Sequence, residues 1–135
     1  MTQVVPWRAG LALSYMAGIV WLSSLSGSEP AWLGILGLPS EVGHTVLFAG
    51  LSAVTFWSLV GPRPRCALLA ALICLVFAVS DEWHQHFVPG RVPSLEDVVA
   101  DGVGIMLGVA FASALPLLWR AQTARATLPK GGLEP

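Results

Sequence analysis

Apolar residues gather in four long blocks along this chain, and short polar connections separate the blocks. The first block runs from Ala9 to Leu25, and the second predicts a helix from about Val42 to Gly61. The third block begins at Cys66, and the fourth helix is expected from Pro93 to about Trp119. A membrane-spanning helix needs about 20 apolar residues, and blocks of this length are too long for buried helices of a small domain. We therefore predict an all-α integral membrane bundle of four transmembrane helices.

The first block has two interpretations. A cleaved signal peptide has a basic start, an apolar centre and a cleavage site with small residues. The same three regions occur here as Arg8, the apolar block and the segment from Ser24 to Ser26. Because the serines match the small-residue cleavage site only loosely, we favour a retained helix.

The connection after this block contains a short apolar segment. Its eight residues from Ala31 to Leu38 are too few to span a bilayer. They predict an interfacial or re-entrant segment with Trp32 at the depth of the headgroups.

The third block is too short to cross a membrane by itself. Its apolar run ends at Val79, and fourteen residues rise only about 21 Å against a hydrocarbon core of about 30 Å. We expect the helix to continue through Asp81, Glu82 and Gln85 until Pro89-Gly90 stops it. These polar side chains would then lie inside the membrane, facing the bundle or a wet cavity.

Two serines mark the expected starts of the later helices. Ser40 follows Pro39 and is a candidate N-cap, with Glu41 in the first turn. Ser94 with an acid three residues later has the pattern of a capping box, which would explain Asp97 without any functional role.

The basic residues predict the orientation. On one side of a four-helix arrangement lie Arg8, Arg63, Arg65, Arg120, Arg125 and Lys130, and Arg91 alone lies on the other. Basic residues favour the cytoplasmic side, so both termini are expected in the cytoplasm of a bacterial inner (plasma) membrane. We expect residues 1–120 to form the membrane domain and residues 121–135 to be a disordered cytoplasmic tail.

Composition agrees with a membrane protein. The chain is 55% hydrophobic and 11% charged, and its mean hydropathy is +0.71. Its net charge of −1 and the lack of a basic, aromatic-rich patch argue against nucleic acid as a partner. Membrane lipids are the expected partners.

The charged residues are concentrated where the outer ends of the second, third and fourth helices would meet. The candidate catalytic residues, which could transfer a proton or activate a ligand, are His44, Asp81, Glu82 and Asp101. Candidates for ligand binding are Glu41, Gln85, Arg91 and Asp97. Asp81 and Gln85 are four residues apart, as are Asp97 and Asp101, so each pair shares a helix face.

Each candidate also has a structural interpretation. Arg91 either binds an anionic ligand or pairs with Asp97 and holds the loop. His44 is either a proton carrier or metal ligand, or a helix-terminal histidine bonded to Asp81 or a backbone carbonyl. His84 and His86 alternate around their helix, so at least one is expected at the surface.

Metal binding is the less favoured chemistry. His44, Asp81, Glu82 and Asp101 offer ligand atoms, but the chain has no HExxH pattern and no clustered cysteines. We predict no metal, and the sequence specifies no cofactor.

These segments resemble the VanZ-like family of small bacterial membrane proteins. The resemblance rests on Ser80 to Gln85, Val88 to Arg91 and Ser94 to Asp97, followed by Gly104 and Gly108. Upstream, Glu41-Val-Gly-His44 with Phe48 is similar to the family's acid-Lys-x-His element. The sequence departs from the family at Val42, where lysine is usual, at Phe48, where tyrosine is common, and at Asp101, where asparagine is usual.

The resemblance implies four spans and a link to the cell envelope, because the founding member is associated with low-level resistance to teicoplanin. It implies no particular reaction. We expect a polar site at the outer leaflet that binds or modifies an anionic envelope lipid or precursor, with a possible effect on glycopeptide susceptibility. The alternative is a non-catalytic structural or assembly factor whose polar residues hold the helices together. Gly104 and Gly108 form a small-residue face at which another helix, or a second copy in an oligomer, could approach closely.

Overall fold

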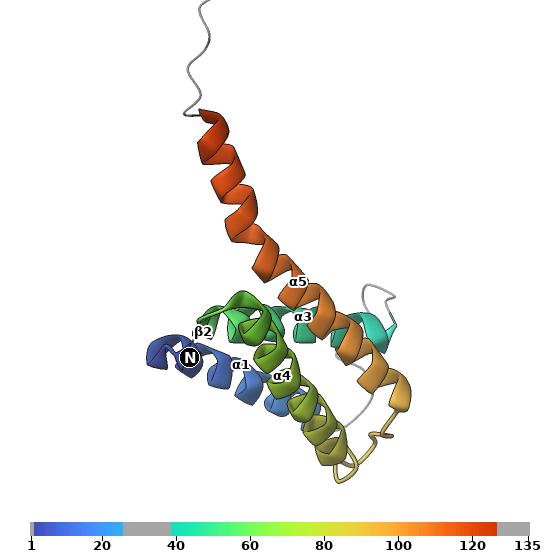
Figure 1. The fold of residues 1–135 in the computed structure, drawn as a ribbon. Coiled ribbons are helices and arrows are strands. Elements are labelled where there is room, and N and C mark those ends of the chain that lie inside the picture. Colours follow the sequence, from blue (N-terminus) through green and yellow to red (C-terminus); the bar gives the residue numbers. More distant parts are fainter. Residues whose placement is uncertain (1, 26–38, 127–135) are drawn as a thin grey trace, which may run out of the picture.

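Four helices make up the part of the chain that the computed structural model describes, residues 2–25 and 39–126 (Figure 1). They are α1 (Pro6–Ser23), α3 (Ser40–Ser58), α4 (Arg63–Gln85) and α5 (Leu95–Ala126). The predicted all-α class is confirmed. Among the described residues, α4 and the part of α5 from Leu95 to Leu115 are long and apolar enough to cross a membrane. That α1 and α3 also cross stays a prediction.

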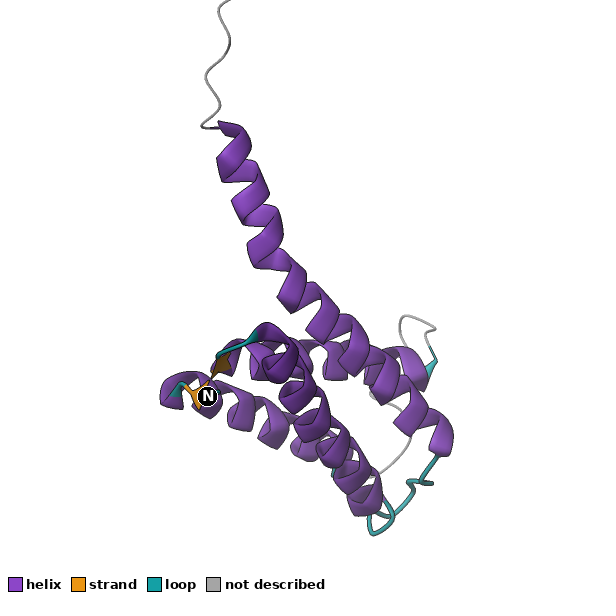
Figure 2. Ribbon diagram, in the orientation of Figure 1, coloured by secondary structure: helices purple, strands orange, loops and turns teal. Residues whose placement is uncertain are grey.

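A small β-ribbon joins the start of α1 to the end of α3, which the sequence did not predict (Figure 2). Strands β1 (Gln3–Val4) and β2 (Leu59–Val60) pair in antiparallel register. The amide of Val5 extends the pairing by donating to the carbonyl of Ser58, at 2.9 Å. Because β2 is extended, α3 ends at Ser58 rather than at the expected Gly61.

Helix α5 lies along α3 at very short range. A Cβ atom on Gly104 would overlap the carbonyl oxygen of Thr45, and one on Gly108 would overlap that of Ala49. Across the same contact, the Ser52 hydroxyl donates to the Ile105 carbonyl at 3.1 Å. The predicted small-residue face is therefore a helix contact within one chain. Whether this face also takes part in an oligomer stays a prediction.

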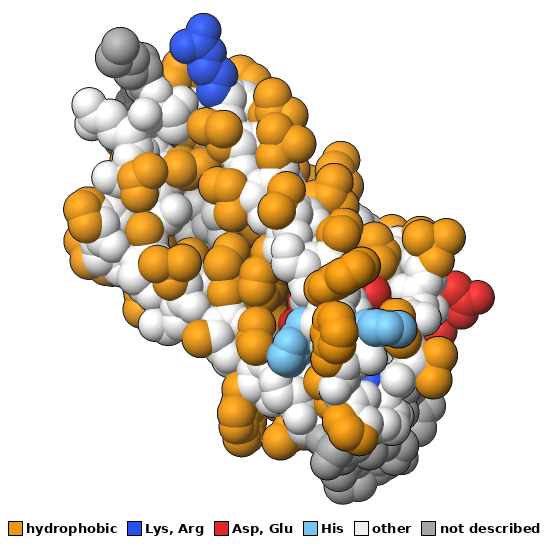
Figure 3. All heavy atoms as spheres, turned by 90° about the horizontal axis from the view of Figure 1, so that it is seen from below, with side chains coloured by type: hydrophobic (Ala, Val, Ile, Leu, Met, Phe, Trp, Pro, Cys, Tyr) orange, Lys and Arg blue, Asp and Glu red, His pale blue; other side chains and the backbone are white. Residues whose placement is uncertain are grey.

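The core of the bundle is small, and most large apolar side chains point away from it. Its buried members are Ile19, Phe48, Leu51, Cys74, Ala78 and Ile105. Trp21, Val76 and Met106 are in contrast 65%, 67% and 68% exposed. Figure 3 shows apolar side chains over much of the visible face. So much exposed apolar surface is unsuited to water and suited to lipid.

Several expected boundaries change in the structure. Pro39, not Ser40, is the N-cap of α3, and Glu41 lies in its first turn as predicted. Helix α4 ends at Gln85, and Gly90 then turns the chain with a φ of 84°, which favours glycine. Helix α5 continues past the expected end near Trp119, so the predicted tail of residues 121–135 begins inside a helix. The predicted segment from Ala31 to Leu38 lies outside the described residues.

Candidate functional site

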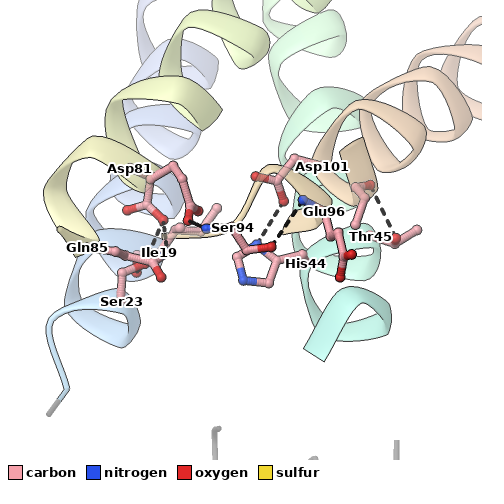
Figure 4. Close-up of polar contacts among 11 residues, drawn as sticks. Ile19, Ser23, His44, Thr45, Asp81, Gln85, Ser94, Glu96 and Asp101 are labelled. Atoms are coloured by element: carbon pink, nitrogen blue, oxygen red, sulfur yellow. Dashed lines mark hydrogen bonds and ion pairs between the residues drawn. The ribbon is translucent and has the colours of Figure 1, made fainter. Parts of the chain in front are cut away.

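Polar side chains gather at the end of the bundle where α3 and α5 begin and α4 ends. Four of them are almost fully buried: Asp81, Glu82, Gln85 and Asp101 are 3%, 8%, 3% and 1% exposed. A carboxylate inside an apolar environment costs free energy unless it is bonded or neutralised. The partners of each carboxylate therefore define the site (Figure 4).

His44 pairs with Asp101 across the α3–α5 contact. Nδ1 of His44 lies 3.0 Å from Oδ1 of Asp101. The close approach of Gly104 to Thr45 explains this pairing, because Thr45 follows His44 and Gly104 lies one turn after Asp101. The alternative in which His44 bonds to Asp81 or a backbone carbonyl is not what the structure shows. Opposite an ionised Asp101, Nδ1 carries the hydrogen and Nε2 is free to accept a proton.

Asp81 is held from two helices. Its Oδ2 accepts hydrogen bonds from the Ser23 hydroxyl of α1 at 2.7 Å and from Gln85 Nε2 at 3.2 Å. The predicted Asp81–Gln85 pair on one helix face is thus confirmed. The other oxygen, Oδ1, is buried and has no hydrogen-bond partner among the described residues.

Helix α1 also contributes to this end of the molecule, which the sequence argument missed. Besides Ser23, its neighbour Ser24 lies 2.9 Å from Nε2 of His84, hydroxyl oxygen to ring nitrogen. The signal was the pair of serines at the end of an otherwise apolar block. The cleavage-site interpretation of Ser24 to Ser26 includes only one of these two serines and leaves Ser23 unexplained.

Glu82 fixes the start of α5 to the end of α4. Its Oε1 accepts the backbone amide of Ser94 at 2.5 Å, and the Ser94 hydroxyl accepts the amide of Glu96 at 3.1 Å. Ser94 therefore acts as the N-cap, as predicted. The second oxygen of Glu82, Oε2, is buried without a hydrogen-bond partner in the described part of the chain.

Arg91 lies in the turn between α4 and α5. Its amide donates to the Val88 carbonyl at 3.1 Å, and the positive φ of Gly90 shapes the same turn. Nε of Arg91 is buried and lacks a hydrogen-bond partner within the described residues. A buried guanidinium donor without a partner is costly, and an anion is the group that it binds best.

A cavity of about 380 Å³ opens among these residues. It is lined by four of the predicted ligand-binding residues and by His44: Glu41, His44, Gln85, Arg91 and Asp97. Asp81, Glu82 and Asp101 do not line it and lie behind it, bonded to other parts of the bundle. The structure thus separates the eight candidates into an inner lining and a buried supporting layer.

The cavity has an uneven charge. Arg91 is its one lining cation among the described residues, against the carboxylates of Glu41, Glu96 and Asp97. Asp97 and Glu82 also interact electrostatically with the ring of His44. A ligand anion would therefore be attracted by Arg91 and repelled by these lining carboxylates.

The remaining histidines lie beside the site. His86 is exposed and packs edge-on against Phe87, with ring centroids 5.3 Å apart. This confirms that at least one of His84 and His86 is at the surface. In residues 2–25 and 39–126, no group of three or more His, Cys, Asp or Glu side chains is placed to hold a metal ion.

The fold and the site define the class: a small helical membrane-type protein with a polar cavity at one end of an apolar bundle. The model of the VanZ/LLP1 family matches residues 11–119, which is most of the chain. The protein belongs to this family, as the resemblance predicted. Neither the curated proteins nor the solved structures gave a significant match.

Proposed function

We propose that the protein binds, and acts chemically on, an anionic lipid or lipid-linked precursor of the cell envelope at the cavity between α3, α4 and α5. The observation that carries the proposal is that Arg91 and His44 line the same cavity, while the partner of His44, Asp101, is buried behind it. An anion-binding donor and a histidine supported by a carboxylate are the two parts that an acid–base site requires.

Arg91 binds the anionic group. Its planar guanidinium can donate two parallel hydrogen bonds to a phosphate or carboxylate, which a lysine cannot reproduce. Gln85 and Ser94 offer additional polar contacts from the cavity wall. Glu41 and Asp97 limit how far the anion can enter.

His44 moves a proton. With Nδ1 held by Asp101, Nε2 can accept a proton from a hydroxyl or a water beside the bound anion, and the buried carboxylate stabilises the resulting imidazolium. Asp81 and Glu82 position α1 and α5 around the cavity rather than contacting the ligand. Asp81 and Glu82 are catalytic candidates from the sequence, and in this proposal they hold the helices that surround the cavity.

Membership of the family and the two spanning helices support a location in the membrane. We extend this to a multi-pass protein of the bacterial inner membrane with both termini in the cytoplasm and the cavity at the outer leaflet. An effect on glycopeptide susceptibility would follow if the ligand is a cell-wall precursor.

The test is the identity of bound lipid in the purified full-length chain. Mass spectrometry of extracts should find less bound anionic envelope lipid or lipid-linked precursor with Arg91→Lys than with the wild type. Arg65→Lys, an exposed arginine at the other end of α4, is the matched control and should retain the wild-type amount. Equal lipid content in all three proteins, with equal melting temperatures, would contradict the proposal.

A second function, a non-catalytic assembly factor, is favoured by one observation. Asp81, Glu82 and Asp101 each bond to a residue outside their own helix: Ser23, Ser94 and His44. If these bonds exist only to hold helices together, Arg91→Lys should leave every phenotype unchanged, while replacing any of the three acids lowers the melting temperature.

A further inference from the structure

A second cavity lies at the opposite end of the bundle, where the β-ribbon joins α1 to α3. Its volume is about 420 Å³, within the range of small-molecule sites. It runs between α3 and α5 and is lined by Arg8, Ala53, Trp57, Phe111, Ala112 and Leu115 among others. It shares no lining residue with the cavity at Arg91. Along α3, His44 and Trp57 are separated by roughly 20 Å at about 1.5 Å per residue.

Arg8 is the charged residue of this second cavity, and all its other lining residues are apolar. The guanidinium carbon of Arg8 lies 4.4 Å from the ring centroid of Trp57, and Nη1 donates to the Trp57 carbonyl at 3.2 Å. The Nε atom is buried and has no hydrogen-bond partner among the described residues. The guanidinium of Arg8 is thus held in place on the ring of Trp57, and its Nε–H remains available to donate to a ligand.

Trp7 and Trp57 mark the depth of this end in a membrane. Their rings meet edge to face, with centroids 5.0 Å apart. Tryptophan is enriched where headgroups meet hydrocarbon, and arginine beside it extends its charge toward the headgroup phosphates. Beside Arg8 and Trp57, the cavity is lined by apolar residues of α3 and α5, which suit an acyl chain.

We propose that this cavity is a binding site for one anionic phospholipid, with its phosphate on Arg8 and an acyl chain against Ala53, Phe111 and Ala112. The charge of Arg8 selects the anionic headgroup, and the apolar lining accepts the chain. The bound lipid fills the space between the end of α3 and the α5 residues Phe111, Ala112 and Leu115, and it stabilises their contact. This site is independent of the proposed chemistry at Arg91.

The experiment is native mass spectrometry of the full-length chain in mild detergent, titrated with dioleoylphosphatidylglycerol or dioleoylphosphatidylcholine. One phosphatidylglycerol should bind about tenfold more tightly than phosphatidylcholine, which corresponds to one charge-assisted hydrogen bond. Arg8→Gln should abolish this preference. Arg65→Gln removes the same charge from the same end of the bundle without touching the cavity and should preserve it.

Ala112→Phe tests the apolar part. The larger ring fills the cavity and should weaken the binding of both lipids while Arg8 remains. The loss of phosphatidylglycerol binding caused by Arg8→Gln should be equally large in the wild-type and Arg91→Lys backgrounds, which separates this site from the one at the other end.

Equal affinity of the wild type for both lipids would overturn the proposal. It would also be overturned if Arg8→Gln and Arg65→Gln changed the lipid preference equally, or if Ala112→Phe bound both lipids as tightly as the wild type does. A protein dimer observed in place of a lipid adduct would overturn it as well. If Arg8→Gln fails to fold, the wild-type comparison and Ala112→Phe decide the question by themselves.

Discussion

Nδ1 of His44 on α3 lies 3.0 Å from Oδ1 of Asp101 on α5, and Asp101 is only 1% exposed. The pair joins the two most closely packed helices of the bundle and faces the cavity through the ring of His44 alone. Asp101 therefore places a carboxylate in an almost fully buried position, where a lone charge would be costly. The pairing gives that carboxylate a partner and His44 a fixed orientation.

The first prediction concerns this pair. Asp101→Asn keeps an oxygen that can accept the hydrogen of His44 Nδ1, so it should cost about 1 kcal/mol or less in unfolding free energy. Asp101→Ala removes the acceptor, leaves a buried donor unpaired and should cost about 3 kcal/mol. Thermal unfolding in detergent measures both. In the His44→Gln background, the extra cost of Asp101→Ala should shrink, and purely additive losses would show that the two residues are not coupled.

The second prediction concerns the glycines of the α3–α5 contact. Gly108→Ala should destabilise the bundle by about 1–3 kcal/mol, because its Cβ would overlap the Ala49 carbonyl, a backbone group that cannot move aside alone. Gly102→Ala on the same helix is the control, since a Cβ there meets nothing within 4 Å. It should be neutral or stabilise by up to about 1 kcal/mol through helix propensity. A similar melting temperature for the two variants would contradict the close packing.

The third prediction concerns Ser23. Ser23→Ala removes the 2.7 Å hydrogen bond to Asp81 and leaves Gln85 as the remaining donor to this buried carboxylate among the described residues. The expected loss is about 1–3 kcal/mol in unfolding free energy. Ser14→Ala is the matched control on α1, because the exposed Ser14 hydroxyl bonds only to the carbonyl of Gly10 in its own helix. Chemical or thermal unfolding should separate the two; equal stability would mean that α1 does not depend on Asp81.

The fourth prediction concerns topology. Val92, which is 83% exposed in the α4–α5 turn, should react as Val92→Cys with a membrane-impermeant thiol reagent added outside intact cells. Thr123→Cys should react only after the cells are opened. The natural Cys66 and Cys74 provide the background, and both are buried at 2% and 0% exposed. The reverse labelling pattern would place the cavity on the cytoplasmic side and remove the basis for an envelope ligand.

The fifth prediction concerns the polar lining. Arg91→Lys should keep the fold, with a change in unfolding free energy below about 1 kcal/mol, because the positive charge remains at a half-buried position in the turn between α4 and α5. It should lose bound anionic ligand, because an ammonium cannot reproduce the bidentate geometry. Melting temperature and lipid content are measured on the same preparation. If the unfolding free energy falls by several kcal/mol and the amount of bound lipid does not change, Arg91 is a structural residue.

The helices, though not the β-ribbon, and the polar character of the site can be predicted from the amino-acid sequence alone. The lengths of the apolar blocks predicted four helices, because an apolar run of that length can be buried or immersed only as helix. The turn at Pro89-Gly90 and the cap at Ser94 were predicted correctly, since both depend on chemistry within a few residues. The short third block placed Asp81 and Glu82 inside the bundle, and both are buried.

Which of these polar residues meet depends on how the helices pack against one another. The partner of His44 is Asp101 rather than Asp81, because the contact of Gly104 and Gly108 with α3 sets how α5 is rotated and how deep it lies. Each residue turns a helix by about 100°, so composition and block length leave that rotation undetermined. The role of Ser23 and the β-ribbon depend in the same way on packing between segments distant in the chain. The sequence determines which side chains are polar, and the contact between helices determines which of these side chains lie next to one another.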